Sequence, residues 1–247
     1  MIDILVPVLG RPGNVDSLIE SIYRTTSVPH KVWFLTSPDD EAQREACLAT
    51  DERIIEVEGK HNQYPRKMNV GFRASTESFV LLAADDIDFQ ADWDTIALTM
   101  AEETGAGVIG LNDLANKQVM KGVWSTHPLV RRSYIMEQGG SLDGPGTLLH
   151  EGFDHNFVER ELCGLAMQRG KWDFAPEAKV KHRHPIYRTA TEDETYKKGQ
   201  STFRQDQLLF LERAKLWGEH GLLPGERAAI RQQEQQARRR RRRVSRS

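Results

Sequence analysis

The sequence predicts an α/β fold built on a doubly wound, mainly parallel sheet. Apolar runs of strand length alternate with helix-like stretches through roughly the first hundred residues, which is the pattern of repeated strand–helix units. Several of these runs end in polar or charged loops, and parallel strands bring such loops together at one edge of the sheet. With 247 residues, of which 38% are hydrophobic and 28% charged, the chain is long enough for one large domain of this class.

The regular elements are expected in the first part of the chain, where near-continuous apolar runs predict buried strands. The expected strands are 2–6, 32–35, 54–57, 79–83 and 107–111, and the expected helices are 15–22, a polar helix ending near 48, 64–73 and 93–104. Asn14 is expected to cap the first helix, and Pro65 to lie in the first turn of the third. The sequence has no Gly-x-Gly-x-x-Gly fingerprint and no Walker-type Gly-Lys-Ser/Thr, so neither a dinucleotide fold nor a P-loop is expected.

The second part of the chain has a less regular pattern. Short strands are expected at 118–123 and 126–130, an alternating strand at 178–184, a Gly- and Pro-rich loop at 139–152, and helices at 133–138, 157–169 and 201–217. We therefore expect a single domain over 1–220, with a regular half over 1–112 and a less regular half over 113–220. Residues 221–247 are expected to form a separate tail.

The tail is strongly basic. Residues 226–247 carry nine Arg and two Glu, a balance of +7, so the net charge of −2 leaves −9 on the rest of the chain. Six consecutive arginines at 238–243 predict disorder, because such a run cannot pack. The tail could contact nucleic acid or an anionic surface, act as a solubilising segment, or bind the acidic body. The sequence leaves these three roles open.

No apolar run is long enough to cross a membrane, and the amino terminus lacks the features of a signal peptide. Cys47 and Cys163 are the only cysteines, and their apolar neighbours suggest two free, buried thiols. These features predict a cytoplasmic protein without a transmembrane segment.

An acidic cluster follows the strand expected at 79–83. Asp85, Asp86 and Asp88 fall within four residues, and like charges held this close repel unless a cation lies among them. Asp86 and Asp88 are two residues apart, so in an extended segment both side chains would point to the same side. The cluster therefore predicts a divalent metal site that holds a phosphate-bearing substrate. The alternative is an acidic loop that caps the next helix.

These residues resemble a known family. Val6-Pro7 after the first strand, Asn69-Val70-Gly71 before the fourth, and the Asp-x-Asp of Asp86 and Asp88 resemble the GT-A glycosyltransferases, the family-2-like group in particular. The resemblance covers roughly the first 185 residues, and residues 125–134 and 150–161 are similar to small glycosyltransferase-like proteins of bacteriophages and bacteria. It implies a nucleotide-sugar half over 1–112 and an acceptor half over 113–220. A phage-encoded member would act in the host cytoplasm.

The resemblance also implies the ligands of the donor site. Mn²⁺ or Mg²⁺ would be held by Asp86 and Asp88, together with His182 or His184 from a later strand. The donor would be a nucleotide sugar, with a UDP-sugar as the first choice. Its expected contacts are Pro7, Arg11, Asp39 or Asp40, Lys67, Asn69 and Asp86. The simpler interpretation is that Asp39 caps a helix and that Arg11 is a solvated surface side chain.

On the acceptor side, the family uses a carboxylate as general base. Glu159 is the first choice, with Asp154 and Glu161 as alternates, and the unchosen ones are expected to be structural. The acceptor region is expected to include Trp124, His127 and His150, although Trp124 alone is more simply read as a core residue.

The predicted activity is therefore metal-dependent transfer of a sugar from a nucleotide sugar to an acceptor, with inversion at the anomeric carbon. Protein, glycan and modified DNA all remain possible as the acceptor. The alternatives are a nucleotidyltransferase, or a non-catalytic protein that binds nucleotide or DNA on a similar fold.

Overall fold

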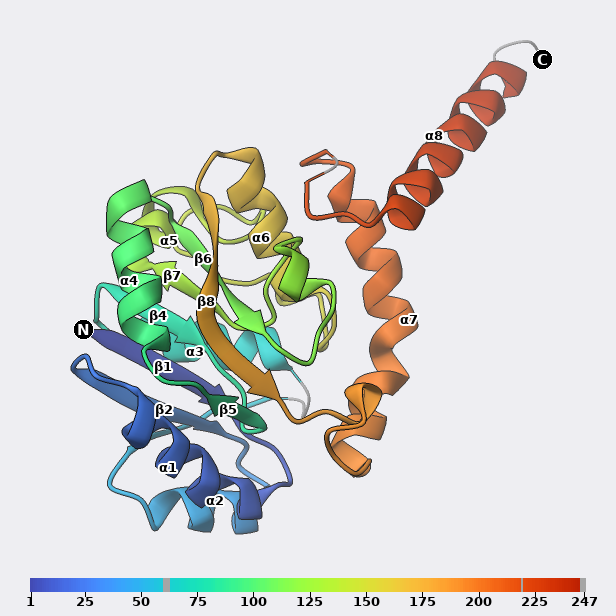
Figure 1. The fold of residues 1–247 in the computed structure, drawn as a ribbon. Helices are drawn as coiled ribbons and strands as arrows, with labels where there is room; N and C mark the ends of the chain where they lie inside the picture. The colour runs from blue at the N-terminus through green and yellow to red at the C-terminus, as the bar shows by residue number, and fades with distance from the viewer. Residues whose placement is uncertain (60–62, 219, 245–247) are drawn as a thin grey trace.

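The computed structural model describes residues 1–59, 63–218 and 220–244, with side chains up to residue 236 (Figure 1). Its centre is an eight-stranded sheet in the order β3-β2-β1-β4-β7-β6-β8-β5. The strands are β1 Ile2–Pro7, β2 His30–Thr36, β3 Arg53–Glu56, β4 Phe79–Leu82, β5 Ile87–Phe89, β6 Val108–Asp113, β7 Pro128–Arg131 and β8 Trp172–His182. Only β5 and β7 run antiparallel to their neighbours, so the predicted mainly parallel α/β fold is confirmed.

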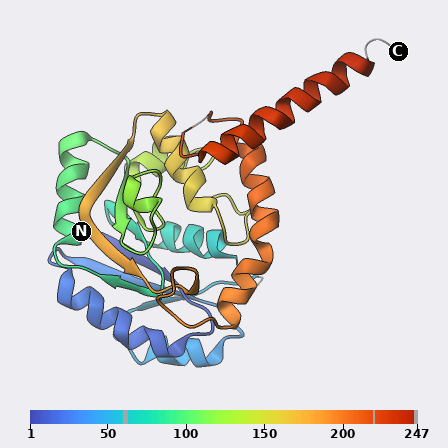
Figure 2. The ribbon, with the colours of Figure 1, turned by 45° about the vertical axis from the view of Figure 1, so that its right-hand side comes forward.

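Helices cover both faces of the sheet (Figures 1 and 2). They are α1 Val15–Thr25, α2 Glu41–Leu48, α3 Tyr64–Ala74, α4 Trp93–Thr104, α5 Arg132–Gln138, α6 Val158–Gln168, α7 Glu194–Ala214 and α8 Pro224–Val244. Three short 3₁₀ turns join them, η1 Pro12–Asn14, η2 Val119–Lys121 and η3 Pro185–Tyr187.

The apolar runs form strands because both faces of the sheet are buried. Successive side chains of β1 point to opposite faces, so Ile4 packs with Leu18 of α1 in one core while Leu5 packs with Met68 of α3 in the other. The first core lies under α1 and α4, and the second lies under α3, α6 and α7. A strand in which apolar and polar residues alternate would place polar side chains in one of the two cores.

Several local expectations differ from the structure, among them the strand expected at 178–184, which forms Trp172–His182 and leaves His184 outside it. Residues 118–123 form the turn η2 instead of a strand, because the Asn116 side chain accepts the backbone N–H of Gln118 and Gly122 has a φ of 68°. Asn14 precedes α1 but makes no capping hydrogen bond with its side chain, because η1 leads directly into the helix. β5 was not expected, and α7 begins at Glu194 where a helix from about 201 was expected.

The carboxy-terminal segment differs most. Residues 221–247 were expected to be disordered, but Pro224–Val244 form helix α8. Its first turns are tied to the body by buried Leu222 and Ile230 and by the ion pair of Arg160 with Glu226 at 2.6 Å. The rest of α8 projects away from the sheet (Figures 1 and 2). Ala, Gln, Glu and Arg all favour helix, which explains the difference, and residues 245–247 lie outside the described part.

None of the helices within the described residues is both long enough and apolar enough to cross a membrane.

Candidate active site

The site is built at the edge of the sheet where several strands end. The loop after β1 brings Arg11, the turn after β4 brings Asp85 and Asp86, and β6 and β8 end in Asp113 and His182. The first turn of α7 lies against the same residues (Figure 2). The prediction that the loops of β1 and β4 meet at one edge is confirmed by these contacts.

Arg11 lies between the carboxylates of the acidic turn. Its Nη1 is 3.2 Å from Asp85 Oδ1 and 3.0 Å from Asp86 Oδ2, and its Nε is 2.8 Å from Asp193 Oδ2. The guanidinium also stacks on Tyr196, 3.7 Å from the ring centroid. Burial and the charge of Asp86 raise the pKa of Asp85 to about 7, although Arg11 opposes this. Arg11 thus supplies the positive charge that the acidic cluster needs.

Asp86 is the most heavily contacted member of the cluster. Its Oδ1 is 3.1 Å from Nε2 of His182, and its Oδ2 accepts the hydroxyl of Tyr196 at 2.9 Å. Burial alone would raise the pKa of Asp86, but His182, Arg11 and Tyr196 together hold it below its usual range. Burial would lower the pKa of His182, but Asp86 and Asp113 raise it. The contact between Asp86 and His182 therefore favours the charged form of each group.

The predicted metal ligands do not converge. Asp85 and Asp86 form a turn before β5, so the alternation expected between Asp86 and Asp88 does not apply and that expectation is wrong. Asp88 lies opposite Lys181 in the β5–β8 ladder, 3.6 Å from Nε of Arg183, whereas Asp86 contacts His182.

The other predicted metal ligand, His184, uses its Nδ1 to accept the N–H of Ile186. Among the residues that the structure describes, no group of three or more His, Cys, Asp or Glu side chains is arranged to hold a metal ion. In this arrangement the residues do not fit the divalent cation, because Arg11 occupies the space beside the carboxylates.

The residues expected in the acceptor region are mostly buried. His127 is 4% exposed and its ring lies 5.1 Å from that of His182, and burial followed by the nearby His182 lowers its pKa to about 4. Trp124 is 8% exposed, with the Arg160 guanidinium 4.1 Å from its ring. His150 is bound through Nδ1 to Asp143 at 2.6 Å. Neither His127 nor Trp124 is an open platform for a sugar, so both are structural in this arrangement.

Four of the predicted donor contacts, Lys67, Asp40, Pro7 and Asp39, lie in or near the loops after β1 and β2. Lys67 is buried, donates to the carbonyl of Val8 at 2.7 Å, and has a pKa lowered to about 8 by burial. Asp40 accepts the N–H of Gly10 at 2.6 Å and caps α2, so it holds the loop after β1 in place. Pro7 ends β1 beside this loop, and Asp39 lies in the turn before α2.

Asn69 was also expected to bind the donor. Its side-chain amide instead donates to the carbonyl of Leu149 and to Glu151, and its Oδ1 accepts the N–H of Leu149 at 2.9 Å. Both ends of the amide are used, so Asn69 connects α3 to the loop before α6.

The three candidate bases have different surroundings. Glu161 is 1% exposed and forms two hydrogen bonds of 2.6 Å with Arg213, so it is structural. Asp154 lies in the loop before α6, where its backbone N–H is bound by Asp206. Glu159 accepts the hydroxyl of Tyr64, and burial raises its pKa to about 7 despite this hydrogen bond. A pKa of about 7 suits a group that accepts a proton near neutral pH, which favours Glu159 as the base.

Three important residues were not identified from the sequence, and all belong to α7 or to its start. Asp193 binds Arg11, and Tyr196 holds Asp86. Asp206 accepts the backbone N–H groups of residues 154, 155 and 156 at 2.8–3.0 Å, which fixes the loop that leads to Glu159. They form no local motif, because their partners are far away in the chain. The only available signal was Asp193 at the start of a polar helix.

No family model matches the sequence, and no curated relative was found. Solved structures do match. A mannosyltransferase from Pyrobaculum calidifontis, in complex with GDP-Man and Mn²⁺, aligns with a TM-score of 0.67 at 13% identity, over 93% of this chain and 67% of that one. Glucosyl-3-phosphoglycerate synthase from Mycobacterium tuberculosis, in complex with Mn²⁺, UDP-glucose and phosphoglyceric acid, aligns with a TM-score of 0.60 at 13% identity, over 87% and 80%. S. aureus TarS aligns with a TM-score of 0.56 at 11% identity, over 86% of this chain but only 43% of that one.

Identities of 11–13% establish the fold alone. The alignments cover 86–93% of this chain. The chain therefore has a GT-A-type fold, the fold of the glycosyltransferases to which its structure is similar.

Proposed function

We propose that this protein is a glycosyltransferase that moves a sugar from a nucleotide-sugar donor to an acceptor hydroxyl. The observation that carries the proposal is the placement of Glu159. Its pKa is raised to about 7 by burial, and His182 is close enough to affect it electrostatically. These two features support Glu159 as the candidate base, within electrostatic range of the charged cluster.

In the proposed reaction Glu159 accepts the proton of the acceptor hydroxyl. The hydroxyl oxygen then attacks the anomeric carbon, and the bond from that carbon to the phosphate oxygen breaks. The electron pair leaves with the nucleoside diphosphate, and the configuration at the anomeric carbon inverts. Tyr64 orients the Glu159 carboxylate through its hydrogen bond, and Asp206 fixes the preceding loop. Lys67, buried under the loop after β1, is proposed to meet the nucleotide.

Use of Mn²⁺ or Mg²⁺ is also proposed. It is supported by the two structural neighbours that were solved with Mn²⁺. The ion requires the carboxylates that Arg11 now occupies, so no chemical step is assigned to it. A UDP-sugar stays our first choice of donor, and GDP-Man in the mannosyltransferase makes GDP-sugars the second.

The test is a panel of UDP- and GDP-sugars with Mn²⁺, in which release of nucleoside diphosphate is measured with sugar, glycan, protein and DNA acceptors. Glu159→Gln is expected to lower transfer by about 10²–10⁴-fold, the usual contribution of a general base. Glu103→Gln is the matched control, because Glu103 is an exposed glutamate on α4, remote from the site. If no donor is bound or turned over, the proposed function is wrong.

The same panel separates the alternatives. A nucleotidyltransferase would release pyrophosphate from a nucleoside triphosphate, and a non-catalytic protein would bind nucleotide without releasing product. If Glu159→Gln transferred sugar at the wild-type rate, another group would have to be the base even with the reaction class correct.

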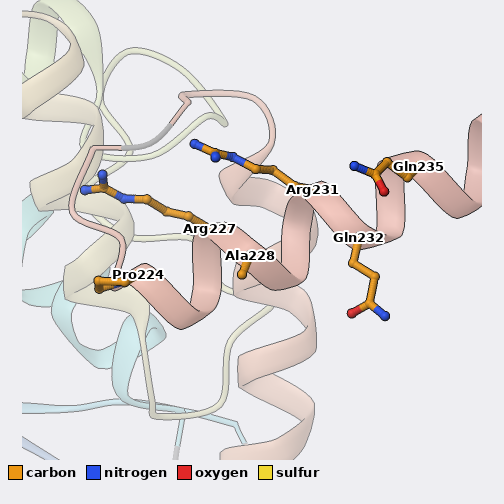
Figure 3. Close-up of a pocket in the computed structure, with 6 residues that line it drawn as sticks. All are labelled: Pro224, Arg227, Ala228, Arg231, Gln232 and Gln235. Carbon is orange, nitrogen blue, oxygen red and sulfur yellow. The ribbon is translucent and has the colours of Figure 1, made fainter.

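For α8 we propose contact with the phosphate backbone of a nucleic acid. The pocket at the base of α8 is lined by Pro224, Arg227, Ala228, Arg231, Gln232 and Gln235 (Figure 3). None of these belongs to the candidate active site. Beyond Ile230 the helix has only Arg, Gln, Glu and Ala up to residue 243, so it lacks the apolar face that a membrane-bound helix inserts. Phosphates require only the charge.

The test of α8 is binding of a fluorescent DNA duplex by the wild type and by a chain that ends at residue 236. Deletion is expected to abolish binding that weakens steeply with salt, and to leave nucleotide binding unchanged. Equal DNA affinity of the two chains would contradict the proposal. Binding to anionic vesicles but not to DNA would show that the partner is a membrane.

A further inference from the structure

A buried arginine follows the candidate base directly in the chain. The side chain of Arg160 is 9% exposed, and its guanidinium lies 4.1 Å from the ring centroid of Trp124 and 4.6 Å from that of Phe210. A third ring, that of Phe157, is 5.4 Å away. Aromatic faces attract a guanidinium, most strongly where water is excluded. The three rings come from the loop before β7, from α7 and from the residue before α6, so Arg160 joins three segments of the chain.

The charge of Arg160 is balanced by the carboxy-terminal helix. Nη1 donates to Oε1 of Glu226 at 2.7 Å and Nη2 donates to Oε2 at 2.6 Å, which makes a bidentate ion pair with the first turn of α8. Nη2 also donates to the carbonyl of Gly221 at 3.0 Å. Oε2 of Glu226 in turn accepts the N–H of Leu223 at 2.7 Å. A bidentate pair fixes geometry as well as charge, so the position of Arg160 depends on the docking of α8.

The backbone just before α6 has a conformation that needs support. Phe157 has a φ of 68°, in the left-handed region that bulky residues rarely adopt. Its ring packs on those of Phe203 and Phe210, with centroids 5.0 and 5.3 Å apart, and its carbonyl accepts the N–H of Arg160 at 3.1 Å. A strained residue persists only where its surroundings hold it, so the rings around Arg160 also hold the start of α6. We use the name Arg160 cluster for Arg160, Trp124, Phe157, Phe210 and Glu226.

Glu159 lies in the chain between two members of this cluster, Phe157 and Arg160. Its carboxylate is outside the cluster and accepts the hydroxyl of Tyr64 on α3. We propose that Arg160 is a positioning residue for Glu159, and that α8 holds Arg160 in place through Glu226. The first turn of α6 sets the direction of the Glu159 side chain, and the cluster fixes this turn on both sides of residue 159. The inference rests on the proposed function, in which Glu159 is the base.

The proposal divides α8 into two parts. Its first turn, with Glu226, serves the candidate active site without reaching it, and its later arginines serve the contact with phosphates proposed above. Placement matters for the base, because an error of about 1 Å in a reacting group can lower the rate by about 10²-fold.

The experiment measures kcat, the KM of the donor that the panel identifies, and the pKa of the Glu159 carboxyl by NMR titration without ligand. Glu226→Gln keeps the shape of the side chain and removes its charge. We expect it to lower kcat about tenfold with KM unchanged. We also expect the pKa of Glu159, about 7 in the wild type, to fall by about one unit as the carboxyl becomes more hydrated. Tyr64, His182 and Asp206 also act on the pKa of Glu159, and none of them is replaced.

Glu234→Gln is the matched control, since Glu234 is an exposed glutamate farther along α8, and it should leave kcat and the pKa of Glu159 unchanged. If Glu226→Gln also left both values unchanged, the proposal would be overturned.

A second variant separates positioning from stability, because an unpaired buried charge also destabilises the fold. Arg160→Met combined with Glu226→Leu removes both charges and should recover most of the stability. If Arg160 positions the base, kcat and the pKa of Glu159 stay low in this double variant. Recovery of both together with the stability would show that the ion pair only supports the fold, and would overturn the proposal. If Glu226→Gln does not fold, the double variant decides alone.

The two readouts also distinguish this proposal from the proposed function. A lowered pKa of Glu159 in Glu226→Gln, with no donor turned over by the wild type, would support the positioning of Glu159 and count against the proposed function. Turnover by the wild type with an unchanged kcat and an unchanged pKa of Glu159 in Glu226→Gln would leave the proposed function standing and refute the role of Arg160.

Discussion

The turn after β4, which carries Asp85 and Asp86, and the start of α6 use their carboxylates in different ways. At this edge Asp85 lies within ion-pair distance of Arg11, and Asp86 lies within ion-pair distance of both Arg11 and His182. At the start of α6, Glu161 is paired with Arg213, whereas two residues earlier Glu159 has no cationic partner within ion-pair distance among the described residues. A buried carboxylate with a partner stabilises the fold, and one without a partner keeps a raised pKa and is available for proton transfer.

Removing the partner of Glu161 is expected to have the largest effect on stability. Arg213→Ala leaves Glu161, which is 1% exposed, without the two hydrogen bonds from Arg213, although the N–H of Leu142 still donates to it. Breaking a buried pair in this way costs about 3–5 kcal/mol, and we expect about 3 kcal/mol because Arg213 is partly exposed. Chemical denaturation measures the loss.

The double variant Glu161→Leu, Arg213→Leu is the control, because it removes both charges and should recover most of the stability. If Arg213→Ala lowered the free energy of unfolding by less than about 1 kcal/mol, the ion pair of Glu161 would not stabilise the fold as proposed, and Glu161 and Glu159 would differ less than their surroundings indicate.

The second prediction is that replacing Glu159 stabilises the protein, whereas replacing Arg213 destabilises it. Its pKa in the folded protein is about 7 against an ordinary 4.5, so folding favours the protonated form. The contribution of Glu159 to stability is therefore full below pH 4.5 and is lost as the pH rises through about 7. Glu159→Gln removes this cost, and we expect it to be about 1–2 kcal/mol more stable than the wild type at pH 8, after allowance for partial exposure.

The measurement is the free energy of unfolding of wild type and Glu159→Gln at pH 5 and pH 8. The difference between the two proteins should be small at pH 5 and should grow at pH 8. A variant that is less stable at both pH values would indicate that the Glu159 carboxylate is structural, as Glu161 is.

The smallest expected effect is on the pH dependence of transfer. If Glu159 is the base, kcat/KM should rise with pH and level off near pH 7, where its carboxyl ionises. The hydrogen bond from Tyr64 lowers the pKa of Glu159. Tyr64→Phe should therefore move the rise to higher pH, by about 0.5–1 pH unit.

If the pH profile of the Tyr64→Phe variant coincided with the wild-type profile, Tyr64 would have no effect on the ionisation of the base. Phe72→Leu on the same helix is a suitable control, because Phe72 is a core residue whose side chain has no hydroxyl group.

Much of the fold was predictable because it depends on local pattern. α4 was expected at 93–104 and forms Trp93–Thr104, where Gly105 ends the helix with a φ of 65°. β1, β2 and β4 follow from apolar runs of strand length, since both faces of the sheet need apolar side chains. β5 was missed because three residues give too little pattern, and its hydrogen bonds come from β8, about ninety residues later.

The site was predictable only in part. The sequence indicated that Asp86 and His182 belong to one site, and they lie 3.1 Å apart. It placed Asp88 beside Asp86 by assuming an extended backbone, but the turn at Asp85 and Asp86 separates them. The sequence allowed the three candidate bases to be ranked but did not identify the structural one. Nothing in residues 154–161 indicates that Glu161 forms an ion pair with Arg213.

By itself, the sequence determined the order of strands and helices and the presence of excess negative charge after β4, because both follow from residues that are close together in the chain. Only the tertiary structure decided how that charge is balanced. Arg11 is 74 residues from Asp85 and 182 from Asp193, and no local pattern encodes a contact over such separations. The physical reason is that an ion pair in a buried site depends on which side chains the packed core brings together, and this is a property of the whole fold.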